Sequence, residues 1–419
     1  MKPIGRRSLF AVLLALSVLF DTSVFPVRLP AQSSPYLHLS ALAIPSYTSV
    51  DPVPGGNGLD EFRVTQAMLM VHAGVLGNRL RLLGTFNAEG WTMPDGELGI
   101  GVWGEGFYDR RHPHTYVMEL MLTGDHPLGR DFRVSLSAGK GFAPYGSDDP
   151  MNRPTVIFPV NHHWGQILER AVLIGGASWR VLTLEAGLFN GDEPEYPSQW
   201  PNMDRFGDSW SARLTFRPMA GLEFQGSHAE VKSPENRAGA GLENSKWSVS
   251  GRADRPLWGG KGYLFGEWAE NDEASGTFVW RSFLFEGAWS RGGHRPYYRY
   301  ENTDRPEETR TSDPFHAPRP IFENSIVGTT RWSINTLGYG YAFGRPDGFS
   351  VQPMLEVSNA FVETVGGGIF DPRVFYGGQV FWSVTAAVRL GWRMAGHRMG
   401  RYGVLDDPPP TEPMTHHQM

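Results

Sequence analysis

The chain has 419 residues, a net charge of -6 and no cysteine, and 20% of its residues are charged. The absence of cysteine excludes structural disulfides and a lipid-modified cysteine anchor. The modest negative charge argues against nucleic-acid binding. Length alone is compatible with two or three soluble domains, although β-barrels often exceed that size as one domain.

The first 32 residues are predicted to be a secretory signal peptide. A basic start precedes an apolar run at 9–20, and Leu29-Pro30-Ala31 offers a small-residue cleavage site. The alternative, a membrane anchor, is disfavoured because about 12 apolar residues fall short of the ~20 that a spanning helix needs. Export without a helical anchor leaves a periplasmic protein, a secreted protein or a barrel.

Alternation with a period of two runs through residues 61–394, which we predict to form the barrel. Residues 33–60 before it are interpreted as an N-terminal segment or first strand. The first alternating run places four residues on one apolar face: Phe62, Val64, Met68 and Met70. A Gly-Asn pair at 77–78 then separates two such runs, which indicates a hairpin.

The clearest strands lie in the middle and at the end of the chain. In 209–216 the apolar residues Trp210, Ala212, Leu214 and Phe216 alternate with polar or basic ones. The last run, Ser383–Met394, has an apolar face at its even positions: Val384, Ala386, Val388, Leu390, Trp392 and Met394. This pattern is typical of a strand with lipid on one face and a wet interior on the other.

These runs predict an all-β protein, a transmembrane antiparallel up-and-down β-barrel of about 14–16 strands in a bacterial outer membrane. Five Pro- and Gly-rich stretches are predicted to be long loops, which lie on the extracellular side of such barrels: 47–59, 91–113, 142–160, 192–206 and 302–322. Residues 395–419 are predicted to be a disordered tail that contains His and Met. Trp392 is therefore not the last residue, which departs from the rule that barrels end on an aromatic assembly signal.

Three motifs resemble a family of uncharacterised, porin-like outer-membrane barrel proteins. They are Asp109-Arg110-Arg111-His112-Pro113-His114 with Met118-Glu119-Leu120, then Pro159-Val160-Asn161-His162-His163-Trp164, and last Leu188-Phe189-Asn190-Gly191-Asp192-Glu193-Pro194-Glu195. Thr115 stands where the family pattern has Asp. The resemblance covers about residues 85–235 and implies an outer-membrane barrel, without implying a particular chemistry.

Two groups of histidines are candidate metal ligands. His112 and His114 would point to one face of a strand, and the adjacent His162 and His163 to opposite faces. With a carboxylate such as Glu119, these imidazoles would suffice for a divalent transition metal. The alternative is that they hydrogen-bond loop carboxylates and rigidify a constriction.

The tail contributes a second candidate metal site at His416 and His417, with methionines nearby. His and Met together favour copper-type ions. The alternative is a Pro-rich extension that happens to contain them. No other pattern indicates a cofactor: Gly139-Lys140-Gly141 lacks the spacing of a phosphate loop, and no Gly-x-Ser-x-Gly elbow is present. We therefore predict no cofactor and no enzymatic activity.

The polar face of the strands is predicted to line a pore with charges of both signs: Arg213, Arg217, Glu223, Arg252, Glu267, Arg299, Glu301 and Arg389. Opposed charges across a lumen set a transverse field and a size cutoff. The alternative is that these charges pair between neighbouring strands and seal the interior.

The predicted function is a porin-like channel for small polar solutes or ions, with outer-membrane lipid and the barrel assembly machinery as further partners and no nucleic acid. Two alternatives remain. One is an outer-membrane protein that handles a copper-type metal, and the other is a secreted soluble β-sandwich that binds carbohydrate through its many Trp residues. No protomer interface is evident, so the sequence leaves the oligomeric state open.

Overall fold

The computed structural model describes residues 35–51, 60–76, 79–91, 115–147, 153–194, 197–232, 243–308, 326–345, 347–375, 377–394 and 398–405. The predicted signal peptide lies outside these residues. The strands are β1 (Tyr36–Asp51), β2 (Asp60–Val75), β3 (Leu80–Asn87), β4 (Val117–Pro127), β5 (Phe132–Gly141), β6 (Arg170–Trp179), β7 (Leu182–Phe189), β8 (Ser209–Met219), β9 (Leu222–Val231), β10 (Asn244–Leu257), β11 (Gly260–Glu273), β12 (Phe278–Ser290), β13 (His294–Glu308), β14 (Ile326–Tyr341), β15 (Phe343–Gly344), β16 (Phe349–Thr364) and β17 (Val380–Trp392).

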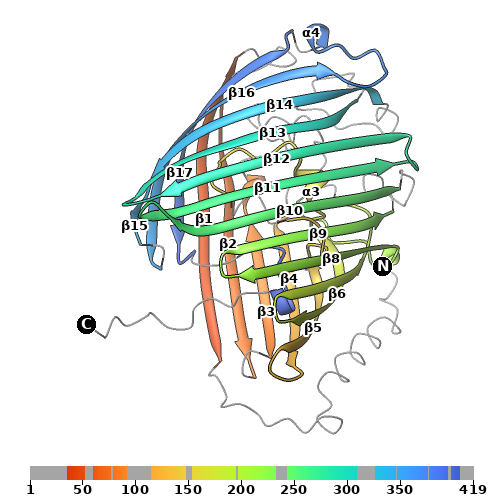
Figure 1. The fold of residues 1–419 in the computed structure, drawn as a ribbon, viewed down its shortest axis with the longest axis vertical. Coiled ribbons are helices and arrows are strands. Elements are labelled where there is room, and N and C mark those ends of the chain that lie inside the picture. Colours follow the sequence, from red (N-terminus) through yellow and green to blue (C-terminus); the bar gives the residue numbers. More distant parts are fainter. Residues whose placement is uncertain are drawn as a thin grey trace.

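All these strands belong to one antiparallel sheet that closes on itself (Figure 1). Each strand pairs with the next along the chain, and β1 pairs with both β2 and β17. The two-residue β15 only extends the pairing of β16, so sixteen strands make the wall. The predicted antiparallel up-and-down barrel is confirmed. The alternative of a β-sandwich is wrong, because a closed sheet has no second sheet to pack against.

Side chains alternate between the two faces of this wall. In β8, Ser211, Arg213 and Thr215 are buried, whereas Trp210 and Leu214 are 44% and 49% exposed on the outside. The alternation predicted for the last strand is confirmed over β17, which begins at Val380 and ends at Trp392. An apolar outer face against a polar inner face is the arrangement that a lipid environment stabilises.

For the first alternating run, at residues 62–70, the predicted outward face is wrong in its second half. The β1–β2 pairing shifts register between Leu42 and Ile44, and Gln66 of β2 has a φ of 54°. This bulge inserts one extra residue and reverses the alternation after it. Met68 and Met70 therefore point inward, where they are 5% and 3% exposed. The barrel also begins at β1, before the predicted boundary at residue 61.

The two ends of the barrel differ. Two-residue turns join β6 to β7, β8 to β9 and β10 to β11 at one end, where β1 begins and β17 ends. The long connections lie at the other end, and β13 runs on to Glu308, so the loop predicted at 302–322 begins later. In outer-membrane barrels the short turns face the periplasm. No helix among the described residues is long and apolar enough to cross a membrane.

Strand length divides the wall into two sides. The short-strand side, β3–β9, has strands of 8 to 11 residues. The long-strand side comprises β10–β14, β16, β17, β1 and β2, whose strands have 13 to 16 residues. A tilted strand needs about 9–11 residues to span a membrane. The long-strand side therefore extends beyond the hydrocarbon layer.

Candidate functional site: the barrel interior

The connection between β5 and β6 folds into the barrel. We call its described residues, 142–147 and 153–169, the inner loop. Phe142, Val156 and Phe158 are only 4%, 2% and 4% exposed. The long loop predicted at 142–160 lies between β5 and β6, at the end of the barrel with the long connections, but its described residues fold into the barrel. The apolar run Val156-Ile157-Phe158-Pro159-Val160 explains the difference, because those side chains lose contact with water only inside the barrel.

Carboxylates of the long-strand side hold the backbone of the inner loop. Glu356 of β16 accepts hydrogen bonds from the amides of Val156 at 2.5 Å and Ile157 at 3.3 Å. Glu301 of β13 accepts one from the amide of Val160 at 2.7 Å. Charge-assisted hydrogen bonds of this kind are stronger than neutral ones. The loop is therefore fixed where its backbone would otherwise lack partners.

A third carboxylate, Glu267 of β11, holds side chains of the same loop. It accepts hydrogen bonds from Asn161 Nδ2 at 2.8 Å and from the Ser147 hydroxyl. The guanidinium of Arg153 lies 4.0 Å from Glu267 and 3.8 Å from Glu286 of β12. Arg153 is 3% exposed, so its charge is balanced inside the protein and not by solvent.

Arginines of the wall bind the carbonyl groups of the loop. Arg299 of β13 donates to Ile157 O at 2.6 Å and to Thr155 Oγ1 at 2.8 Å. Arg389 of β17 donates to Arg153 O at 3.2 Å. The wall therefore provides acceptors for some of the loop's donors and donors for some of its acceptors, which stabilises a buried polar segment.

The chain after β17 also enters the barrel. We call residues 398–405 the inner tail; it ends in a 3-10 turn, η7 (Gly403–Leu405). Met399, Tyr402 and Leu405 are 3%, 3% and 1% exposed. The prediction of a disordered tail at 395–419 is therefore wrong for these residues, while 406–419 lies outside the described residues.

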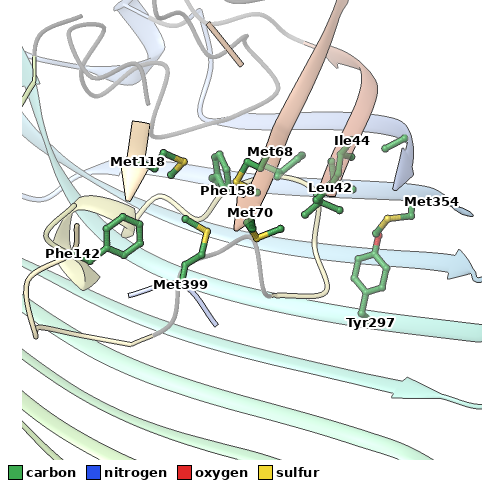
Figure 2. Close-up of a cluster of buried hydrophobic side chains, with 13 residues drawn as sticks. Leu42, Ile44, Met68, Met70, Met118, Phe142, Phe158, Tyr297, Met354 and Met399 are labelled. Atoms are coloured by element: carbon green, nitrogen blue, oxygen red, sulfur yellow. The ribbon is translucent and has the colours of Figure 1, made fainter. Parts of the chain in front are cut away.

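An apolar cluster lies where the inner loop and the inner tail meet the wall (Figure 2). Phe142 and Phe158 come from the inner loop, and Met399 comes from the inner tail. The wall contributes Leu42, Ile44, Met68, Met70, Met118, Tyr297, Met354 and Ala387. Methionine fills irregular gaps because its side chain is unbranched and flexible. The cluster joins both inward segments to β1 and β2.

The predicted pore-lining residues lie on the inner side of the wall. Two arginines of this set pair with carboxylates of neighbouring strands, Arg213 with Glu185 at 2.8 Å and Arg217 with Glu223 at 2.7 Å. Arg252 pairs with Asp254 of its own strand at 2.5 Å. Arg299 pairs with Glu301 at 2.8 Å. Their role in lining a pore stays a prediction, whereas the pairs that Arg213 and Arg217 form between neighbouring strands agree with the alternative interpretation.

The histidine sites remain predictions. His112, His114, His416 and His417 lie outside the described residues. His162 lies in the short helix α3 (His162–Gly165), where it is buried and stacks on Phe158 at 5.6 Å between ring centroids. Within the described ranges there is no group of three or more His, Cys, Asp or Glu residues that would hold a metal ion. Glu119, considered as a partner for a metal, accepts a hydrogen bond from Thr85 Oγ1 at 2.7 Å.

Sequence reasoning missed several residues that position the two inward segments. Glu286 and Glu356 occupy inward positions of β12 and β16, and their charge amid apolar neighbours was an available signal. Tyr402 was missed because nothing in its sequence context indicates a buried segment. Its partners lie up to 283 residues away in the chain, and no periodicity encodes such a contact.

Several solved structures resemble this fold, among them a mutant of an outer membrane protein and a porin. OmpTdeltaL8, a loop L8 deletion mutant of OmpT, an outer membrane protein of Vibrio cholerae, matches over 86% of this chain and 100% of that chain at 11% identity, with a TM-score of 0.52. An anion-selective porin from Comamonas acidovorans matches over 86% of this chain and 100% of that chain at 10% identity, with a TM-score of 0.49. The first likeness shows that the chain has the fold of an outer-membrane β-barrel, and the second adds no further support.

No protein-family model and no curated protein sequence matches the chain. The resemblance of the three sequence motifs to a barrel family therefore stays a prediction. The second motif forms the end of the inner loop and α3, and the third lies at the end of β7.

Proposed function

We propose that the protein is a porin-like channel of the bacterial outer membrane that admits small polar solutes or ions. The observation that supports this most is the closed wall of sixteen strands, whose inner face carries buried charges of both signs while its outer face is apolar. Lipid outside and water inside account for both faces. No catalytic step is part of the proposal.

The inner loop supports a selective rather than a wide passage. It enters from β5 and is anchored on β11, β13 and β16, so it narrows the cross-section between the two sides of the wall. Arginine and glutamate side chains stand along the same path. Rings of fixed charge and a restricted diameter are how channel proteins select solutes.

The test is single-channel recording in planar lipid bilayers with purified, folded protein. We expect discrete conductance steps, together with a reversal potential in a salt gradient that reports ion preference. The same preparation after heat unfolding, in the same detergent, is the control. A folded barrel, verified by its heat-modifiable mobility on gels, that gives no conductance steps would refute the proposal.

A further inference from the structure

The inner tail is held by the short-strand side of the wall along its whole length. Arg81 of β3 donates to Gly403 O at 2.8 Å, and the amide of Val404 donates to Ser135 Oγ of β5 at 3.1 Å. Arg213 of β8 donates to Gly400 O at 3.3 Å. The tail therefore contacts three strands of this side, β3, β5 and β8, and not one strand alone.

Two carboxylates of the wall also anchor the tail, through charge-assisted hydrogen bonds and ion pairs, which are stronger than hydrogen bonds between neutral groups. Glu119 of β4 accepts hydrogen bonds from the Tyr402 hydroxyl at 2.7 Å and from the Gly400 amide at 3.0 Å. Burial and the neighbouring Glu119 raise the pKa of Tyr402 well above its usual value, so the phenol keeps the proton that it donates. Glu223 of β9 pairs with Arg398 at 2.8 Å and with Arg401 at 3.1 Å.

Two glycines show how closely the tail fits its seat. Gly403 has a φ of 61°, and a Cβ added there would lie 2.1 Å from Ser135 Oγ. Gly400 has a φ of 73°, and a Cβ there would lie 2.7 Å from a ring carbon of Phe142. Left-handed backbone and the lack of room both require glycine at these positions. A larger residue would prevent the tail from seating.

The wall is complete without the tail. β17 ends at Trp392, and the ladders that close the barrel, β17 with β1 and β17 with β16, use no residue after it. The described residues of the tail form no strand of the sheet, whereas the inner loop is continuous with strands at both ends. Ordering such a segment costs conformational entropy that its contacts must offset.

We infer that the inner tail is a displaceable plug that restricts passage through the barrel from the turn end, beside the short-strand side. This inference rests on the proposed function and adds to it a second element that determines pore size. The charged anchors Glu119 and Glu223 hold the plug in place, and the inner loop provides part of its seat through the amide of Phe142, which donates to Tyr402 Oη at 3.0 Å.

The experiment compares full-length Gly403→Val, full-length Gly367→Val and the unaltered protein. Gly367 has nothing within 4 Å of an added Cβ, so its valine variant is the matched control. Each protein is recorded in planar bilayers, and cleavage by trypsin at Arg401, which is 2% exposed, is followed in parallel. Heat-modifiable mobility verifies the barrel in every case. A synthetic peptide of residues 395–405 is then added to the Gly403→Val channel.

We expect the single-channel conductance of Gly403→Val to be at least about twice that of the unaltered protein, because a plug is removed from the lumen. Trypsin should cut it rapidly, and the peptide added on the turn side should lower its conductance. Equal conductance in all three proteins would overturn the inference while leaving the proposed function intact. No conductance in any folded protein would overturn both.

Discussion

The two sides of the barrel hold different inward segments in different ways. The long-strand side binds residues 153–160 of the inner loop, through Glu301 and Glu356 among others. The short-strand side binds the inner tail, through Glu119 and Glu223. Each segment starts from one side and crosses to the other, since the loop leaves β5 and the tail leaves β17.

The two segments differ in their relation to the strands of the wall. The loop is tethered at both ends and uses wall groups of both signs, so its loss would leave several buried charges without partners. The strand ladders do not depend on the tail, because β17 closes the barrel before the tail begins. Similar wall chemistry therefore supports a permanent constriction on one side and a removable plug on the other.

The largest expected effect comes from Glu356→Ala on the long-strand side. It leaves three buried donors without their acceptor: the amides of Val156 and Ile157, and the hydroxyl of Tyr297 at 2.9 Å. Since each such donor costs about 1–3 kcal/mol, we expect the free energy of unfolding to fall by about 3–5 kcal/mol. Denaturant unfolding in detergent micelles measures this, and bilayer conductance should rise.

Glu363→Ala is the control for this change, because Glu363 lies on the same strand, exposed on the outer face. It should leave stability and conductance unchanged. If the two variants behave alike, the carboxylate of Glu356 does not anchor the inner loop.

Arginine substitutions on the outer face should show which parts of the two sides lie within the hydrocarbon layer of the membrane. Leu214, in the middle of β8, faces lipid, and Leu214→Arg should cost about 2–4 kcal/mol of unfolding free energy. Glu363 lies near the far end of β16, beyond the hydrocarbon layer, so Glu363→Arg should cost about 0–1 kcal/mol. Reversible unfolding into lipid vesicles measures both. Equal costs would contradict the different heights of the two sides.

A smaller effect is expected at the seat of the tail. Glu119→Gln keeps the shape of the side chain but removes the charge that accepts from Tyr402 and Gly400. If the free energy that holds the tail in place falls by about 1 kcal/mol, trypsin cleavage at Arg401 should become roughly fivefold faster. Glu230→Gln, on the outer face of β9, should leave the cleavage rate unchanged. An unaltered rate in Glu119→Gln would show that this carboxylate does not retain the plug.

The smallest effect concerns ion preference. The Arg217 side chain is 31% exposed and pairs with Glu223, so Arg217→Gln removes one partly solvated positive charge near the turn end. We expect a small shift of the reversal potential toward cations that disappears in concentrated salt, because exposed charges are screened. Arg345→Gln, whose side chain is 79% exposed, is the control. A shift that persists in concentrated salt would contradict this explanation.

The fold could be predicted from the sequence wherever two faces with different solvents enforce alternation. Trp210 and Arg213 of β8 point outward and inward as expected, and the outward face of β17 ends at Trp392. The prediction failed at Gln66, because a single bulge residue reverses the pattern without a signal in composition.

The interior could be predicted only in part. Charged residues such as Arg213, Glu267 and Arg299 were placed on the correct face by strand periodicity alone. Their actual partners were not predictable, because Glu267 binds Asn161 and Glu119 binds Tyr402 across 106 and 283 residues of chain. Such contacts depend on where a non-repetitive segment finds acceptors for its backbone, which a period of two does not encode.

The central claim, that two inward segments obstruct one water-filled barrel, is tested most directly by single-channel conductance of the Glu356→Ala/Gly403→Val double variant. If the inner loop and the inner tail each restrict the passage, the double variant should conduct more than either single variant. A folded double variant with the conductance of the unaltered protein would contradict the account.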